Sequence, residues 1–254
     1  MEWDRYGFVA NNPIIFKDPN GTYIIIYYEE DGKQQGYRYE YGVSYEGDNS
    51  FIQNTVAQLD YLIENSPIDE NIIQQLATDE DFKWEIVNIT LERMHTDDAK
   101  LSDGITTLGI PTTNVARTSY FDLVGFKTNT GGLQSPVSTL YHEGGHAYLR
   151  LQYYQLAQKY QETKDPNILI ELERTIEKME STTSTDYLND EEQYVNETYE
   201  IPLAKQMGDG IRTSDFGSKT YETTNPFTSK PKGFIGPINL PPGKLPKSVI
   251  KTFR

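Results

Sequence analysis

The segment from Pro136 to about Tyr160 combines a helical apolar pattern with two histidines four residues apart, His142 and His146, in the run YHEGGHA. Positions i and i+4 lie on the same face of an α-helix, so both imidazoles can reach one metal ion. Glu143 lies about 100° further round the helix, where it can reach a water on that ion without binding the ion itself. The spacing therefore predicts a helix that carries half of a metal site.

The composition limits which residues can complete this site. The chain has three histidines and no cysteine, which excludes a disulfide framework, a thiolate zinc finger and a cysteine nucleophile. Imidazole and carboxylate ligands suit Zn²⁺, and three protein ligands with one open position are typical of catalytic zinc sites. The third histidine, His95, lies far upstream of the motif. We therefore expect a carboxylate from a later helix as the third ligand.

A last helix, predicted over about Asp190–Met207, offers two such carboxylates. Glu192 is the only charged member of an apolar stripe that steps by three or four residues: Leu188, Glu192, Val195, Tyr199 and Leu203. A carboxylate on a buried helix face requires a cation, so Glu192 is the predicted ligand. Glu191 is held in reserve, because it shares a face with polar neighbours and an acidic first turn of a helix is common.

The remaining pattern predicts an α+β fold. The expected elements are a hairpin of Thr22–Glu29 and Lys33–Tyr41 around Asp31-Gly32, a helix over 51–64, a short helix from Ser66-Pro67 to Ala77, a strand Phe82–Thr90, loops with one or two strands over Leu101–Gly132 including Tyr120–Phe126, and a helix from Asp165-Pro166 to about Glu180. The strand Tyr120–Phe126 is interpreted either as a core strand or as an edge that pairs with an extended substrate. Pro202 is expected to kink the last helix near Glu200.

Two glycines inside the motif helix conflict with helix propensity. Gly144 and Gly145 each cost about 1 kcal/mol relative to alanine in a helix interior. We expect them where another backbone approaches the helix closely.

The charge of the chain excludes several partners. With 23 Lys+Arg and 38 Asp+Glu the formal net charge is −15, which disfavours general binding of nucleic acid. No apolar run is long enough to span a bilayer, so no membrane span is expected. Residues 1–5 lack the basic and apolar regions of a signal peptide.

The first twenty residues resemble the closing segment of the Rhs/YD-repeat shell. The matching positions are Tyr6, Val9, Asn11, Asn12, Pro13, Asp18, Pro19 and Gly21. In that family a variable effector or toxin domain follows this segment. The resemblance implies a boundary after residue 21, with a domain over 22–254 that has an N-terminal hairpin in 22–50 and an irregular tail over 210–254. It also implies delivery as the end of a larger exported protein, and a cognate immunity protein as partner.

The motif region, about residues 100–216, is similar to the HExxH effector metallopeptidases, some of which are Rhs-linked toxin domains. The similarity rests on HEGGHAY at 142–148, on Glu191-Glu192 with Val195, and on Gly208-Asp209-Gly210 with Arg212. It implies a zincin-like fold, in which a small mixed or antiparallel sheet packs on the motif helix and a second helix carries the acidic ligand. In that family the two histidines and a downstream acidic residue bind zinc, and the motif glutamate is the general base.

The expected activity is zinc-dependent hydrolysis of a protein or peptide substrate, with Glu143 as general base and ligands His142, His146 and Glu192. Tyr199, Tyr221 and Arg212 are candidate donors to the oxyanion. Two alternatives remain open: a zinc amidase that acts on cell-wall peptides, and a non-catalytic Rhs tail module with a vestigial motif.

Overall fold

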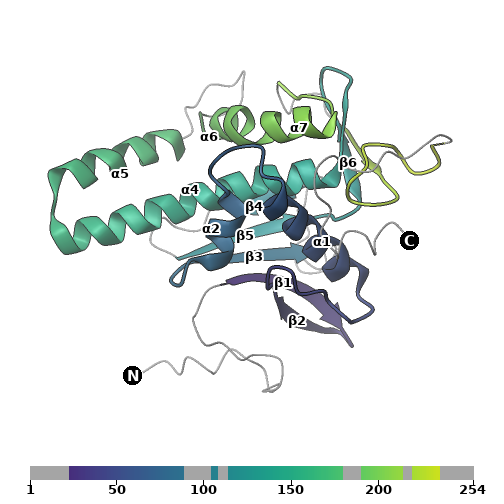
Figure 1. The fold of residues 1–254 in the computed structure, drawn as a ribbon, viewed down its shortest axis with the longest axis horizontal. Helices are drawn as coiled ribbons and strands as arrows, with labels where there is room; N and C mark the ends of the chain where they lie inside the picture. The colour runs from purple at the N-terminus through teal and green to yellow at the C-terminus, as the bar shows by residue number, and fades with distance from the viewer. Residues whose placement is uncertain (1–22, 89–103, 108–113, 180–189, 214–218, 235–254) are drawn as a thin grey trace.

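The computed structural model describes residues 23–88, 104–107, 114–179, 190–213 and 219–234, and these form an α+β fold (Figure 1). The strands are β1 Tyr23–Glu30, β2 Lys33–Arg38, β3 Lys83–Asn88, β4 Gly104–Thr107, β5 Val115–Tyr120, β6 Val124–Lys127, β7 Leu133–Gln134 and β8 Lys219–Glu222. The helices are α1 Ser50–Glu64, α2 Ile72–Thr78, α4 Pro136–Thr163, α5 Pro166–Met179, α6 Asp190–Val195, the π-helical turn η1 Asn196–Glu200 and α7 Ile201–Met207. The segment 1–21, His95 and Leu188 lie outside the described residues.

The main sheet is mixed and has the order β2-β1-β3-β5-β4. The predicted hairpin is confirmed: β1 and β2 pair antiparallel up to Glu30 and Lys33. Asp31 and Gly32 have φ of 53° and 70°, the two positive φ values that the twist-matched two-residue turn requires. β3 pairs parallel with both β1 and β5, so long connections separate these strands in sequence.

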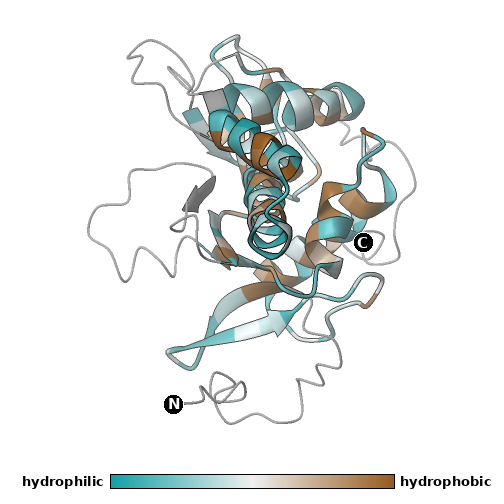
Figure 2. Cartoon of the chain, turned by 90° about the vertical axis from the view of Figure 1, so that its left-hand side faces the viewer, coloured by the Kyte–Doolittle hydropathy of each residue, from teal (hydrophilic) through white to brown (hydrophobic). Residues whose placement is uncertain are grey.

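The helices cover this sheet through one apolar core. α1 and α2 contact β1, and the N-terminal half of α4 contacts α2, β4 and β5. The core includes fully buried side chains from every layer, among them Ile24, Ile52, Ile72, Trp84 and Leu140. In Figure 2 the helices show a hydrophobic face and a hydrophilic face, as expected for elements buried on one side.

Three predicted elements differ from the structure. The short helix begins at Ile72, not at Ser66-Pro67, because the Asn71 side chain caps it through Gln74 N, whereas the Ser66 hydroxyl bonds Ile68 O. The predicted strand Tyr120–Phe126 is divided between β5 and β6, which belong to different sheets. The tail after residue 210 is not wholly irregular, because β8 pairs with β6 in a second, antiparallel sheet of order β7-β6-β8.

The predicted motif helix and the helix that follows are confirmed. α4 starts with Pro136 in its first turn and ends at Lys164, whose φ of 53° is left-handed. Its residues from Pro136 to Leu151 are all buried, whereas its C-terminal half extends with α5 beyond the rest of the fold (Figure 1). The motif thus lies on the buried half of a long helix.

The two glycines of the motif are packing positions for side chains, not for another backbone as we had expected. A Cβ at Gly145 would lie 2.6 Å from Tyr199 Cδ2 and 2.9 Å from Val195 Cγ1. A Cβ at Gly144 would lie 2.8 Å from Ile73 Cδ1. The two glycines therefore lower the intrinsic helix propensity of α4, but they allow η1 and α2 to pack close to it.

Gly145→Ala is expected to lower the free energy of unfolding by up to about 2 kcal/mol. Alanine gains about 1 kcal/mol of helix propensity, but overpacking against the fully buried Tyr199 ring costs about 1–3 kcal/mol. Gly144→Ala is the matched control, because Ile73 Cδ1 is the end of a flexible side chain and can move aside. Chemical denaturation measures both variants, and a more stable Gly145→Ala protein would contradict this packing.

Candidate metal centre

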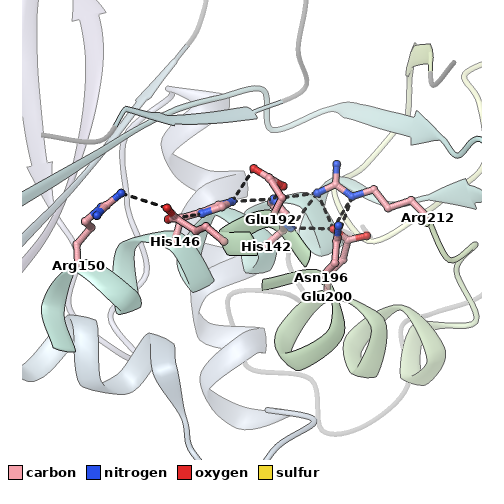
Figure 3. Close-up of polar contacts among 8 residues, drawn as sticks. His142, His146, Arg150, Glu192, Asn196, Glu200 and Arg212 are labelled. Atoms are coloured by element: carbon pink, nitrogen blue, oxygen red, sulfur yellow. Dashed lines mark hydrogen bonds and ion pairs between the residues drawn. The ribbon is translucent and has the colours of Figure 1, made fainter. Parts of the chain in front are cut away.

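Helix α4 and helix α6 bring three ligand groups together. His142 Nε2 and His146 Nε2 lie 3.1 Å apart, and the Glu192 carboxylate lies 3.2 Å from the first and 3.0 Å from the second (Figure 3). Both histidines are buried, whereas a quarter of the Glu192 side chain, 26 %, is exposed. The predicted ligands therefore form a cluster that could hold a metal ion.

The spacing of these atoms fits a metal ion. Ligand atoms at about 2.0–2.1 Å from a tetrahedral ion stand about 3.3 Å from one another. The three observed separations, 3.0–3.2 Å, are close to this value. Two imidazole nitrogens and a carboxylate are also the donor set that Zn²⁺ accepts.

A buried carboxylate contacts the Nδ1 atom of each imidazole, on the side of the ring away from the cluster. His146 Nδ1 lies 2.8 Å from Glu191 Oε1, and His142 Nδ1 lies 2.9 Å from Glu200 Oε2. A carboxylate on Nδ1 fixes the ring orientation and directs Nε2 toward the ion. Both ligand imidazoles are thus oriented in the same way, although only one of these carboxylates was considered from the sequence.

The structure gives Glu191 a different place from the predicted one. It is not an exposed residue of an acidic first turn but is 2 % exposed, and it bonds His146 and Arg150. Glu191, the reserve ligand, therefore contacts the Nδ1 side of His146 and is not one of the three clustered ligand groups. The sequence places Glu191 directly before Glu192, on a helix face whose other residues are polar, and this pattern predicts an exposed side chain.

A π-helical turn brings Glu200 onto the face that carries Glu192. In a regular α-helix eight residues would advance the side chain by about 80° beyond two full turns. With about 4.4 residues in a π turn, the four steps from Asn196 to Glu200 fall about 30° short of a full turn, which offsets most of the roughly 40° by which the four α-helical steps from Glu192 to Asn196 exceed one. Ile201 N accordingly bonds Asn196 O, five residues back. Pro202 was expected to interrupt the last helix near Glu200, and the interruption is this π-helical turn. Proline has no N–H with which to continue the α-helical hydrogen bonds.

The segment after α7 carries Arg212 into the site. Asp209 Oδ2 accepts hydrogen bonds from Ser135 N, Ser135 Oγ and Ser138 Oγ at the start of α4, at 2.5–2.8 Å. Gly210 N donates to Leu133 O, and a Cβ at Gly210 would lie 2.5 Å from Gly132 Cα. This strap, residues 208–213, therefore crosses β7 in backbone contact and ends beside His142.

Arg212 is buried and held by several groups. Its Nε lies 2.8 Å from Glu200 Oε2 and 3.1 Å from Asn196 Oδ1, and its guanidinium stacks over Phe126. Its Nη2 lies 2.8 Å from both ring nitrogens of His142. Equal distances place Nη2 on the plane that bisects the ring, so it does not lie along the Nε2 lone pair. The lone pair of His142 Nε2, which points toward His146 and Glu192, can therefore bind a metal ion.

The pKa shifts follow from this burial and pairing. Burial lowers the pKa of His146, but Glu191, Glu192 and Glu143 outweigh it and raise the pKa to about 10. Burial and Arg212 oppose protonation of His142, yet hydrogen bonds to Glu192 and Glu200 raise its pKa. Burial favours the protonated form of Glu200, whereas Arg212 and His142 lower its pKa overall. The hydrogen bonds and charges of their partners lower the pKa of both Glu192 and Glu200, so these two carboxylates are ionised at neutral pH.

The groups around the two imidazoles include two more carboxylates than guanidinium groups. Four carboxylates surround them (Glu143, Glu191, Glu192 and Glu200), against two guanidinium groups, Arg150 and Arg212. In this structure the raised pKa values of His142 and His146 supply the two missing positive charges as imidazolium groups, and a divalent cation bound to neutral imidazoles would supply the same charge.

Glu191→Gln is expected to weaken zinc binding about 10–100-fold, because the amide orients the His146 ring but no longer raises its basicity. Competition with a chromophoric chelator measures the affinity. Glu197→Gln, an exposed glutamate on the same helical segment, is the matched control. Equal affinities of the two variants would show that Glu191 does not act through the ligand.

The structure does not bring the two candidate tyrosines to the cluster. Tyr199 is 1 % exposed, and its ring packs on Gly145 and against Tyr141, Tyr148 and Tyr194. The Tyr221 hydroxyl bonds the carbonyls of Gln134 and Ser229. Arg212 is the candidate donor that the structure does place beside a ligand. Glu200, Asn196 and Gln134 were not identified from the sequence, because only the π turn and the strap make them neighbours.

Glu143 follows His142 on the same buried half of α4 and is 5 % exposed.

Among the described helices none has both the length and the apolar character needed to cross a membrane. Comparison of the chain with models of known protein families, with curated proteins and with solved structures gives no match.

Proposed function

We propose that this chain is a zinc-dependent metalloendopeptidase that acts as a secreted effector or toxin domain. The observation that carries the proposal is the cluster of His142, His146 and Glu192, in which both imidazoles are oriented by buried carboxylates. Glu143, the residue next to a ligand in the motif, supplies the general base.

The chemical role proposed for each residue follows from its side-chain type. A zinc ion held by His142, His146 and Glu192 would supply Lewis-acid chemistry, which polarises a carbonyl group and lowers the pKa of a water to about 7. Glu143 accepts the proton of the attacking water and passes it to the leaving amine. Glu191 and Glu200 hold the imidazoles in place, and Arg150 and Arg212 form ion pairs with those two carboxylates.

A zincin-like arrangement belongs to the same proposal. It is supported by the position of α4, which packs beside a mixed sheet, and by a second helix that presents the acidic ligand. The effector role is supported by the Rhs-like segment at residues 1–21 and by the similarity of the motif region to effector metallopeptidases.

The test is cleavage of a proteome by the purified, zinc-loaded protein, with new N-termini identified by mass spectrometry. We expect discrete cleavage products that disappear with a chelator and return with zinc. Purified peptidoglycan serves as the second substrate, and release of peptides from it alone would identify an amidase instead. Absence of stoichiometric zinc together with absence of any cleavage would overturn the proposal.

A further inference from the structure

Asn196 carries a buried hydrogen-bond donor that the described residues leave unsatisfied. The side chain is 2 % exposed, and Nδ2 has no acceptor within the described part of the chain. The orientation of the amide is fixed by chemistry, because Arg212 Nε donates to it and a guanidinium has no acceptor. The atom that faces Arg212 is therefore Oδ1, and Nδ2 is the atom without a partner.

This donor belongs to the face of the helix that carries the metal ligand. Asn196 follows Glu192 by four residues, which places the two side chains one turn apart on one face. Its amide is joined to Arg212, whose Nη2 lies 2.8 Å from His142 Nε2 (Figure 3). The unsatisfied donor and the guanidinium are thus neighbours beside the cluster.

A buried N–H without an acceptor is costly, and native proteins satisfy nearly all of them. The group that satisfies Nδ2 must be an acceptor, and its site adjoins a guanidinium. Glu200 already supplies a carboxylate to that guanidinium, so a second permanent anion is not required for charge balance. An oxygen that starts neutral and gains negative charge suits the site better.

We infer that Asn196 Nδ2, with Arg212 held alongside, binds the carbonyl oxygen of the scissile peptide bond. This inference rests on the proposed peptidase function and adds to it a residue that donates to the reacting oxygen. As the water oxygen bonds to the carbonyl carbon, the carbonyl π pair moves onto that oxygen, which Nδ2 stabilises. When the pair returns, the C–N bond breaks and the leaving amine takes the proton held by Glu143.

Asn196→Asp and Asn196→Leu test this role together. Aspartate keeps an acceptor for Arg212 Nε but removes the donor, and leucine removes the donor without adding charge. We expect kcat to fall about 10²–10³-fold in both variants, with KM changed by less than about threefold. Asn167→Asp, an exposed site on α5, controls for the added charge.

Binding supplies a readout that is independent of turnover. A phosphinic analogue of a peptide that the wild-type protein cleaves presents a tetrahedral oxyanion. Its affinity, measured by calorimetry, should fall about 10²-fold or more in both Asn196 variants. Acetohydroxamate affinity and zinc stoichiometry should stay unchanged. In the wild-type protein the Asn196 side-chain amide resonances should shift when the analogue binds.

The outcomes separate this inference from the proposed function. Wild-type protein without zinc and without cleavage overturns both. Cleavage that requires Glu143, together with wild-type kcat and analogue affinity in Asn196→Leu, overturns the role of Asn196 alone. A loss confined to Asn196→Asp also overturns it, because charge repulsion and not donor removal would then be the cause.

Discussion

Glu143→Gln is expected to reduce peptide cleavage by about 10²–10⁴-fold while the protein retains one zinc ion per chain. The amide fills nearly the same volume but cannot accept the proton of the attacking water. Glu143 is not one of the three ligand groups, so metal binding does not depend on it. Cleavage of a fluorogenic peptide derived from the proteome-wide assay measures the effect, and elemental analysis measures zinc.

Glu197→Gln is the control for this experiment, since it makes the same chemical change at an exposed position. Full activity in Glu143→Gln with zinc retained would remove Glu143 from the chemistry. Loss of zinc in Glu143→Gln would instead assign the residue to the ligand set.

His146→Ala is expected to abolish stoichiometric zinc binding and to destabilise the fold. The substitution removes one of three ligands and leaves the carboxylate of Glu191, 2.8 Å from the lost Nδ1, with Arg150 as its remaining partner. Loss of one hydrogen-bond partner of a buried group costs about 1–3 kcal/mol. Zinc analysis and thermal unfolding with and without added zinc measure the two effects.

His95→Ala is the natural control, because it removes the histidine that lies outside the motif. We expect it to bind zinc as the wild-type protein does. A zinc-dependent rise in melting temperature that survives His146→Ala but not His95→Ala would show that the ligand set is wrong.

How far the sequence predicts the fold depends on whether a signal is local. The Asp31-Gly32 hairpin, helix α1 and helices α4 and α5 were predicted because turn residues and apolar periodicity act within a few residues. The predicted start of α2 was wrong because the chain holds two capping residues close together, and Asn71 caps the helix while the Ser66 hydroxyl bonds Ile68 O instead. Strand β8 was missed because its partner β6 lies almost a hundred residues earlier.

The candidate site shows the same division. The spacing of His142 and His146 predicted two converging imidazoles, and the apolar stripe of the last helix selected Glu192. The burial of Glu191 was not foreseen, because its partner Arg150 lies on another helix. The positions of Tyr199 and Tyr221 were open for the same reason, since 19 tyrosines offer many candidates and only packing places them.

The sequence by itself predicted the two histidines of the candidate cluster, because helical periodicity converts a four-residue spacing into a shared face, and it favoured Glu192 over Glu191 as their partner. It also limited the third candidate ligand to a carboxylate, because the chain has no cysteine and only one further, distant histidine. Only the tertiary structure decided what surrounds these ligands. The π turn at Asn196–Glu200 rotates Glu200 behind His142, and the strap anchored by Asp209 carries Arg212 to the same imidazole. Both depend on contacts between residues far apart in the chain, which no local pattern encodes.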